Sequence, residues 1–410
     1  MPSSLFSARA FFRDPIGFVR AKGDSGPVRL AAGRGRFVLL RDPEAIWRVL
    51  VTDAGAFRQG KWKRRASRFL GPTLNTLDGD EHRRRRLLLQ PALDRRRLAA
   101  FAPAIVARAD RIQARWEDGA RIVLRKELDP LCLAMAGNAL LSTELEPEAD
   151  GLAKALGTVM AGVPRLTPPL PGTPQAKALS SVHRALDRLI EERRRAPGAN
   201  GDLVSTLLGS GLSEEVVRGE LTAFLLAAVD EPPSALEATW YLLGRAPHVE
   251  ERLHAELDSV LADRSVALGD EERLPYLGAV LHESLRLFPP ARYVDRCPVH
   301  EVSVDGASLP AGANVLVSPL VTHREPTLWK RPDEFLPERW LGDKPQGPSE
   351  RGAFVPFGAG AHTCIGEPLA RMIMTLSLAT IARRWRLRVD GDAPAPAPGV
   401  ARLVVTLERR

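Results

Sequence analysis

The strongest constraint on the fold is a long run of helical sequence patterns between Glu81 and Leu287, interrupted by connections rich in Gly and Pro. Helical periodicity sustained over so many residues favours helices packed on one another rather than a sheet-based architecture. The clearest interruption is Pro164–Pro174, where repeated prolines prevent one continuous helix. We expect a loop that joins two helices at this point.

Short β-prone segments lie near both ends of the chain. Val28–Ala32 and Arg36–Leu40 are separated by Gly33-Arg34-Gly35, which predicts a hairpin, and Asp42 followed by Pro43 predicts a helix start. Further strands are expected at 302–304, 314–318 and 403–407. No repeat or composition shift marks a boundary, so residues 1–410 are predicted to form a single domain, mainly α with small β-sheets.

Composition limits the cellular setting. Three cysteines, Cys132, Cys297 and Cys364, are too few in 410 residues for a disulfide framework, which favours a cytoplasmic location. The N-terminal residues form neither a signal peptide nor a membrane span. The formal charge of +8 suits an acidic partner, a nucleic acid or an anionic surface.

The sharpest chemical signal is residues 357–366, which read Phe-Gly-Ala-Gly-Ala-His-Thr-Cys-Ile-Gly. A thiolate ligand to haem iron needs N–H donors near its sulfur and a backbone slim enough to approach the macrocycle. Phe357 can shield the sulfur, and Gly366 can admit the following helix. A lone Cys364 would more often be a buried structural thiol, but the whole string predicts a haem-iron ligand.

Two further motifs, taken with this string, resemble the cytochrome P450 family across nearly the whole chain. Glu283 and Arg286 match the family's Glu-x-x-Arg helix motif, and Arg339, in Pro-Glu-Arg-Trp, matches the arginine that completes its ion-pair cluster. Alone, Glu283 and Arg286 would be an ordinary exposed helical pair. The resemblance implies the cytochrome P450 fold and haem b as cofactor.

The resemblance also implies partners for the haem. His82 and Arg86 match a His-x-x-x-Arg motif that places both on one helical face. Arg296 and His362 occupy further propionate-binding positions of the family, and Ala228 is expected beside the haem. For some of the arginines from Arg83 to Arg86, a solvated face is the simpler interpretation.

On the oxygen side, a helix beginning at Ser213 resembles the family helix centred on Ala-Gly-x-Asp/Glu-Thr-Thr. Asp230 takes the acid position, whereas Glu231 replaces the first threonine and is followed by Pro232 and Pro233. Two prolines remove two helical N–H donors, which predicts a groove or a kink. We expect Glu231 and Asp230 to carry catalytic proton chemistry; neutral drift is the alternative.

The resemblance places a substrate pocket beside the haem, and the residues expected to line it are Ala227, Ala291, Arg292, Tyr293 and Val294. Arg292 or Tyr293 is expected to face a polar or anionic substrate group, solvent or a propionate. Leu170–Pro174 resembles a loop of family members that oxidise isoprenoid or other lipophilic compounds.

These features predict a monomeric monooxygenase of secondary metabolism that oxidises a lipophilic small molecule, such as a terpenoid, a polyketide or a fatty-acid-like compound. Electrons are expected from NAD(P)H through separate ferredoxin and ferredoxin reductase proteins, since the chain has no flavin or iron–sulfur segment. The basic stretches 82–86 and 95–97 can attract an acidic ferredoxin, and nucleic-acid binding would explain none of the other motifs.

Three other functions stay open from the sequence. Glu231-Pro232 favours a peroxygenase or a redox-neutral isomerase or cyclase, in which reductase-supplied electrons are not needed. A haem-based sensor or carrier would use the same ligand without turnover, and a helical interaction protein would bind no haem.

Overall fold

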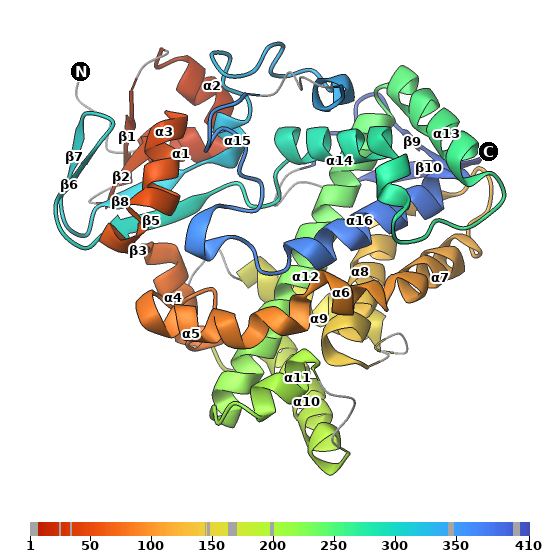
Figure 1. The fold of residues 1–410 in the computed structure, drawn as a ribbon, viewed down its shortest axis with the longest axis horizontal. Helices are drawn as coiled ribbons and strands as arrows, with labels where there is room; N and C mark the ends of the chain where they lie inside the picture. The colour runs from red at the N-terminus through yellow and green to blue at the C-terminus, as the bar shows by residue number, and fades with distance from the viewer. Residues whose placement is uncertain are drawn as a thin grey trace.

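The computed structural model describes residues 7–23, 26–32, 35–143, 145, 148–162, 170–196, 201–342, 348–396 and 402–410. Helices form most of it, with small sheets beside them, as the sequence predicts. Figure 1 shows the largest sheet on one side of the molecule and the helical body on the other, with α12 running through the middle.

The helical body is organised around α12 (Glu214–Leu243), which contacts α8, α9, α10, α14 and α16. The helices of this body are α7 (Ala102–Gln113), α8 (Leu124–Leu141), α9 (Ala149–Gly162), α10 (Pro174–Arg195), α11 (Leu203–Leu208), α13 (Pro247–Leu261), α14 (Pro275–Leu287) and α16 (Glu367–Ala382). Trp240 of α12 is fully buried in the main hydrophobic core. A central helix surrounded by apolar neighbours is a rigid support for a site on its surface.

The remaining helices lie toward the sheet or connect the two parts of the molecule. They are α1 (Ser7–Arg13), α2 (Pro15–Arg20), α3 (Pro43–Trp47), α4 (Lys61–Leu70), α5 (Gly79–Leu89), α6 (Arg95–Ala99) and α15 (Pro319–Thr322). The predicted start at Asp42 is confirmed, because its side chain accepts a hydrogen bond from Ala45 N at 2.7 Å. Ser213 likewise caps α12.

The main sheet has the strand order β1-β2-β8-β5-β3. Its strands are β1 (Val28–Ala32), β2 (Gly35–Leu40), β3 (Phe57–Gln59), β5 (Val294–Pro298) and β8 (Asn314–Val317). β1 and β2 form the predicted hairpin, with Val28 opposite Leu39. β3 pairs with β5 so that Gln59 lies opposite Arg296, which brings two distant segments to one edge.

Two smaller sheets complete the fold. β4 (Arg121–Val123), β10 (Val404–Arg409) and β9 (Trp385–Val389) form one, and β6 (Val302–Val304) pairs with β7 (Ala307–Leu309) in the other. The strands expected near 302–304, 314–318 and 403–407 are confirmed as β6, β8 and β10. α9 ends at Gly162 and α10 begins at Pro174, while 163–169, within the predicted loop, lie outside the described residues.

The oxygen-side helix contains both prolines at which the sequence predicts a groove or a kink. α12 continues as one helix through Pro232 and Pro233. Each proline lacks the N–H that would bond four residues back, so the carbonyls of Ala228 and Val229 lose their regular donors. At Val229 the loss is offset by the Arg125 guanidinium, whose Nη2 lies 3.1 Å from the carbonyl oxygen.

Within the described ranges, the helices are all too short or too polar to cross a bilayer.

Candidate active site

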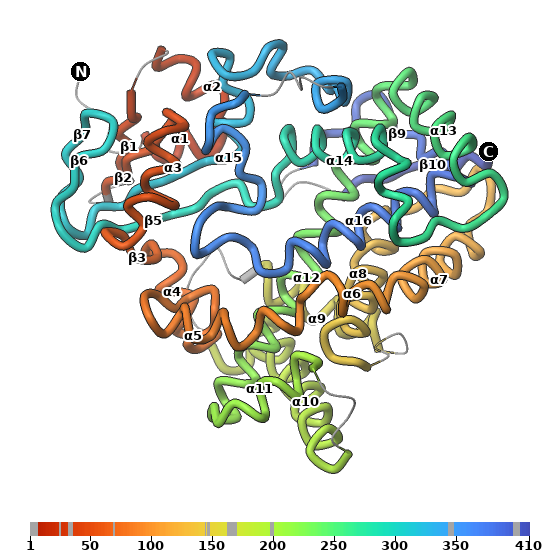
Figure 2. Tube along the Cα trace, viewed as in Figure 1, coloured from red at the N-terminus to blue at the C-terminus, as the bar shows by residue number. Residues whose placement is uncertain are grey.

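Cys364 lies at the end of a tight loop that leads into α16. Its backbone N–H donates to Phe357 O at 2.8 Å, and Gly358 and Gly360 adopt φ of 73° and 71°. A Cβ at Gly360 would lie 2.2 Å from the carbonyl oxygen of Leu50, so only glycine fits there. Figure 2 shows this segment running from the side of the main sheet to the helical body.

The Cys364 thiol differs from the other two cysteines, which are buried. Cys364 is exposed, yet burial by the surrounding protein raises its pKa to about 11, against an opposing hydrogen bond from the Gly366 backbone. A side chain that a water molecule can reach, although protein surrounds it on most sides, lies on the wall of an interior space. Metal coordination deprotonates a thiol outright, so this environment fits an iron ligand.

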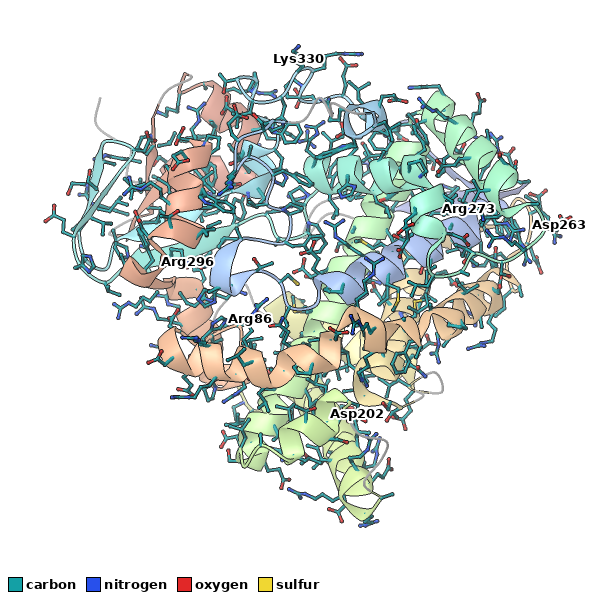
Figure 3. All side chains as sticks on the ribbon, viewed as in Figure 1. Arg86, Asp202, Asp263, Arg273, Arg296 and Lys330 are labelled. Carbon is teal, nitrogen blue, oxygen red and sulfur yellow. The ribbon has the colours of Figure 1, made fainter. Side chains whose placement is uncertain are left out.

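Desolvated basic side chains gather beside this loop. The rings of His82 and His362 have centroids 3.9 Å apart, and Arg86 Nη1 donates to Thr363 O at 2.6 Å. Burial lowers the pKa of Arg86, His82 and Arg296, and lowers that of His362 to about 3 with help from Arg296. Figure 3 shows Arg86 and Arg296 near each other, left of the centre, where the main sheet meets the helices below it. Such a donor set fits the carboxylates of a haem.

Two polar residues of this cluster were missed by the sequence analysis. Gln59 accepts from Arg296 Nη1 at 3.1 Å, and its Nε2 lies 3.0 Å from His362 Nδ1. Asp78 accepts from the Gln59 backbone N–H at 2.8 Å. No sequence motif marks Gln59 or Asp78, because the pairing of β3 with β5 is what brings Gln59 to Arg296.

The predicted Glu–Arg–Arg cluster is fully assembled and buried. Glu283 pairs with Arg286 through two hydrogen bonds of 2.8 Å and accepts from Arg339 Nε at 2.9 Å. Trp340 Nε1 donates to the same carboxylate at 2.9 Å, and Arg286 Nη1 donates to His323 O at 2.7 Å. One carboxylate serves two guanidinium groups, and backbone carbonyl oxygens accept further N–H groups of both, so every charged side chain of the buried cluster is hydrogen-bonded.

This cluster is connected to the cysteine loop through His323. The His323 ring accepts from Val355 N at 3.0 Å, two residues before Phe357. Phe357 itself lies under the Arg371 guanidinium, 4.9 Å from the ring centroid. The cluster therefore fixes the start of the loop that carries Cys364.

On α12, Ala227 and Glu231 lie one turn apart on the same face. Ala227 is exposed although its neighbours Leu226 and Ala228 are buried, and the charge of Glu231 acts on the Cys364 thiol, so this face is turned toward the cysteine loop. Burial, and then the neighbouring Asp230, raise the pKa of Glu231 to about 7. The carboxyl can thus hold or release a proton near neutral pH.

A second face of α12 carries Asp230 and Ser234, again one turn apart. Burial raises the pKa of Asp230, and the Arg125 guanidinium opposes that shift. Arg125 Nη1 donates to Ser234 Oγ at 2.6 Å. Lys63 of α4 is also electrostatically coupled to Glu231, whose charge opposes the lowering of the Lys63 pKa by burial. Neither Arg125 nor Lys63 was singled out from the sequence, since each is distant from α12 in the chain.

The four residues from 291 to 294, which are expected to line a substrate pocket, have different surroundings in the structure. Tyr293 packs in an aromatic cluster, with ring centroids 5.8 Å from Phe11, 5.2 Å from Phe12 and 6.4 Å from Trp62. Arg292 Nη2 donates to Pro396 O at 3.0 Å. Ala291 is half-buried, and Val294 begins β5 opposite Val317. The structure therefore gives Tyr293 and Arg292 protein partners.

A mainly helical fold, a cysteine on the wall of an interior space and a set of desolvated cations beside it define a haem-thiolate protein. The family profile for Cytochrome P450 matches residues 22–408, and the chain belongs to that family. It is a haem-thiolate monooxygenase, and membership of the family implies a haem cofactor.

Three relatives from Streptomyces are similar to most of the chain. Cyclooctat-9-en-7-ol 5-monooxygenase of Streptomyces melanosporofaciens is 36% identical over 95% of this chain and 87% of its own. Cyclooctatin synthase of the same species is 34% identical over 94% and 88%. Pentalenene oxygenase of Streptomyces avermitilis is 31% identical over 93% and 88%.

A solved structure supports the fold. The retinoic acid-bound cyanobacterial CYP120A1 superposes with a TM-score of 0.83 at 24% identity, covering 94% of this chain and 92% of that one.

Proposed function

We propose that this monooxygenase oxidises a cyclic, largely hydrocarbon terpenoid in secondary metabolism. The three Streptomyces relatives are named for oxygenating or forming compounds called cyclooctat-9-en-7-ol, cyclooctatin and pentalenene. The observation that carries the enzyme class is the Cys364 thiol, placed on an interior wall beside desolvated cationic side chains. A haem bound there through its thiolate supplies the oxygen chemistry.

The residues proposed to hold the haem come from both parts of the molecule. Cys364 is the proposed iron ligand, and His82, Arg86, Arg296 and His362 would bind the propionates as charged or neutral donors. Arg296 comes from the main sheet, whereas Cys364 and His82 come from the helical part. Because both parts contribute, we propose that the chain acts as a single domain. We also propose that it acts as a monomer.

Proton chemistry on the oxygen side is assigned to Glu231, with Asp230 as its exchange partner. Glu231 shares a face with exposed Ala227, and its charge acts on the Cys364 thiol, which supports a place for its carboxyl group on the haem side of α12. A carboxylic acid with a pKa near the working pH can donate and recover a proton in each turnover. Asp230, on the adjacent face of α12, interacts electrostatically with Glu231 and Arg125 and is proposed to exchange this proton with solvent.

Electrons are proposed to come from NAD(P)H through a ferredoxin reductase and an acidic ferredoxin. The arginines of the basic stretch of α5 differ in their exposure. Arg83 and Arg84 are exposed beside Leu87, which is 63% exposed, whereas Arg85 is buried and paired with Glu220. An exposed cationic patch around an apolar residue suits a transient acidic partner.

The test is turnover of a cyclic terpenoid with ferredoxin, ferredoxin reductase and NADPH under ¹⁸O₂. We expect an oxidised product that carries one ¹⁸O atom and is absent when NADPH is omitted. Product that forms only with hydrogen peroxide, without an electron donor, would instead establish the peroxygenase alternative. A redox-neutral isomer formed without oxygen would establish the isomerase or cyclase.

A further inference from the structure

The prolines of α12 create a specific hydrogen-bonding deficit. In a regular helix the N–H of residue 233 would donate to the carbonyl oxygen of Val229, and that of residue 232 to Ala228. Proline has no N–H, so both carbonyls lose this donor. Successive residues point about 100° apart around a helix, so the two carbonyls face different neighbours. The Val229 carbonyl accepts a hydrogen bond from a side chain of α8.

Arg125, near the start of α8, reaches three acceptors with its three guanidinium nitrogens. Nη2 donates to Val229 O at 3.1 Å, Nη1 to Ser234 Oγ at 2.6 Å, and Nε to Asp129 Oδ1 at 2.5 Å. The side chain is largely buried, with 15% exposed, and Asp129 neutralises its charge. Two of these three bonds end on α12, on either side of Pro233.

We propose that Arg125 is a positioning residue that supplies the hydrogen-bond donor lost at Pro233 and thereby holds the 229–234 turn of α12 in its working geometry. This role requires arginine, because its planar guanidinium holds three nitrogens apart and can bond Val229, Ser234 and Asp129 together. A lysine at this position has one nitrogen on a flexible side chain. The hydrogen bond to the Val229 carbonyl on the oxygen side thus comes from a side chain of the neighbouring helix α8 and not from the backbone of α12.

The consequence for catalysis rests on the proposed function of Glu231. Asp230 and Glu231 lie between the two contacts that Arg125 makes with α12, at Val229 and Ser234. A shift of this turn would move the Glu231 carboxyl relative to the reacting centre, and small displacements there are costly for rate. Arg125 would therefore control how well electrons are converted into product, without contacting the substrate.

A double-mutant cycle between Arg125 and Pro233 tests the proposal directly. Pro233→Ala restores an N–H that can donate to Val229 O, which makes the arginine partly redundant. In the parent chain, Arg125→Met should lower the thermal midpoint, followed by far-UV circular dichroism, by about 2–6 °C. In the Pro233→Ala background, the same change should lower it by measurably less, because the Val229 carbonyl keeps a donor while Ser234 and Asp129 lose theirs in both backgrounds.

Two matched controls make the cycle specific. Pro232→Ala restores a donor to Ala228 rather than Val229, so it should leave the effect of Arg125→Met unchanged. Lys126→Met removes an exposed cation that lines the same cavity of about 960 Å³ as Arg125 and Asp129, and it should leave the midpoint nearly unchanged. An Arg125→Met effect of equal size in the parent and Pro233→Ala backgrounds would overturn the proposal.

The effect of Arg125 on catalysis is measured as the amount of product formed per NADPH consumed. Arg125→Met and Arg125→Lys should each lower this ratio by roughly tenfold, with little change in KM, and Pro233→Ala should restore much of it. One informative combination is that Pro233→Ala rescues the ratio of product to NADPH in the Arg125→Met chain while Glu231→Gln has no effect on turnover. That combination would support the role of Arg125 and reject only the role of Glu231. An unchanged ratio in both Arg125 variants would overturn the positioning role.

Discussion

The carboxylate of Glu283 accepts a hydrogen bond from Nε of Arg339 at 2.9 Å, between side chains that are 0% and 2% exposed. The same carboxylate is paired with Arg286, so Glu283 is the one anion that serves two buried guanidinium groups. Glu283→Leu leaves both cations buried without a carboxylate and should therefore destabilise the protein by about 3–5 kcal/mol and reduce haem incorporation. Chemical denaturation and the ratio of haem absorbance to protein measure both effects.

The matched control is Arg331→Leu, which breaks an exposed pair with Glu334 on the neighbouring segment. Exposed pairs contribute about 0–1 kcal/mol, so this variant should stay close to the wild type. Equal destabilisation by the two substitutions would show that the Glu283 cluster has no special structural role.

The exposed arginines of α5 should recruit the electron donor. Arg84→Glu should slow reduction by an acidic ferredoxin, and added salt should reproduce the effect in the wild type, because surface attractions are screened. Arg184→Glu, on α10, makes the same charge change at an exposed side chain and serves as the control. Reduction rates independent of salt and of Arg84 would leave this face as an ordinary solvated surface. Arg95 is a less clean site, since it pairs with Glu271 at 2.8 Å.

Glu231→Gln should slow turnover by about 10²-fold while substrate affinity changes little. Glutamine keeps the size and hydrogen bonding of the side chain but lacks the titratable proton. Single-turnover rates and a binding titration separate the two effects. A variant with wild-type rates under every electron source would support neutral drift at this position.

Glu231→Thr restores the usual family residue and separates the proposed chemistries. A monooxygenase should retain much of its reductase-supported activity in this variant. A peroxygenase or isomerase should lose activity in the variant, while the wild type works without an electron donor.

The raised pKa of Glu231 also predicts a pH dependence of stability. Its ordinary pKa is 4.5, and burial raises it to about 7, so between these values the folded chain holds a proton that the unfolded chain has released. Stability from this group therefore falls as pH rises from about 4.5 to about 7. The thermal midpoint of the wild type minus that of Glu231→Gln should decline across this window and level off above it. A constant difference would contradict the assigned pKa.

Much of the architecture could be predicted from local patterns. The hairpin of β1 and β2, the helix starts at Asp42 and Ser213, and the spacing of the Glu283 and Arg339 motifs all depend on residues that are near in sequence or on a family pattern. The loop of Cys364 was predictable for the same reason, because its glycines serve a turn within ten residues.

The rest depends on contacts between distant segments. Gln59 joins the site through the β3–β5 pairing, and Arg125 reaches α12 across more than a hundred residues of chain. The donor to the Val229 carbonyl could not be predicted either, because helix propensity counts only the helix's own donors, whereas α8 supplies this one from outside. Tyr293 could not be placed from its motif, since its partners Phe11 and Trp62 are far away in sequence.

The absorption spectrum of the reduced, carbon monoxide-bound protein tests the central claim most directly. The wild type should show the red-shifted band of a thiolate-ligated haem, and Cys364→Ser should lose it. Cys132→Ser and Cys297→Ser should both retain the band, because these buried thiols lie outside the cysteine loop. Retention of the band in Cys364→Ser, or its absence from the wild type, would contradict the assignment of Cys364 as the iron ligand.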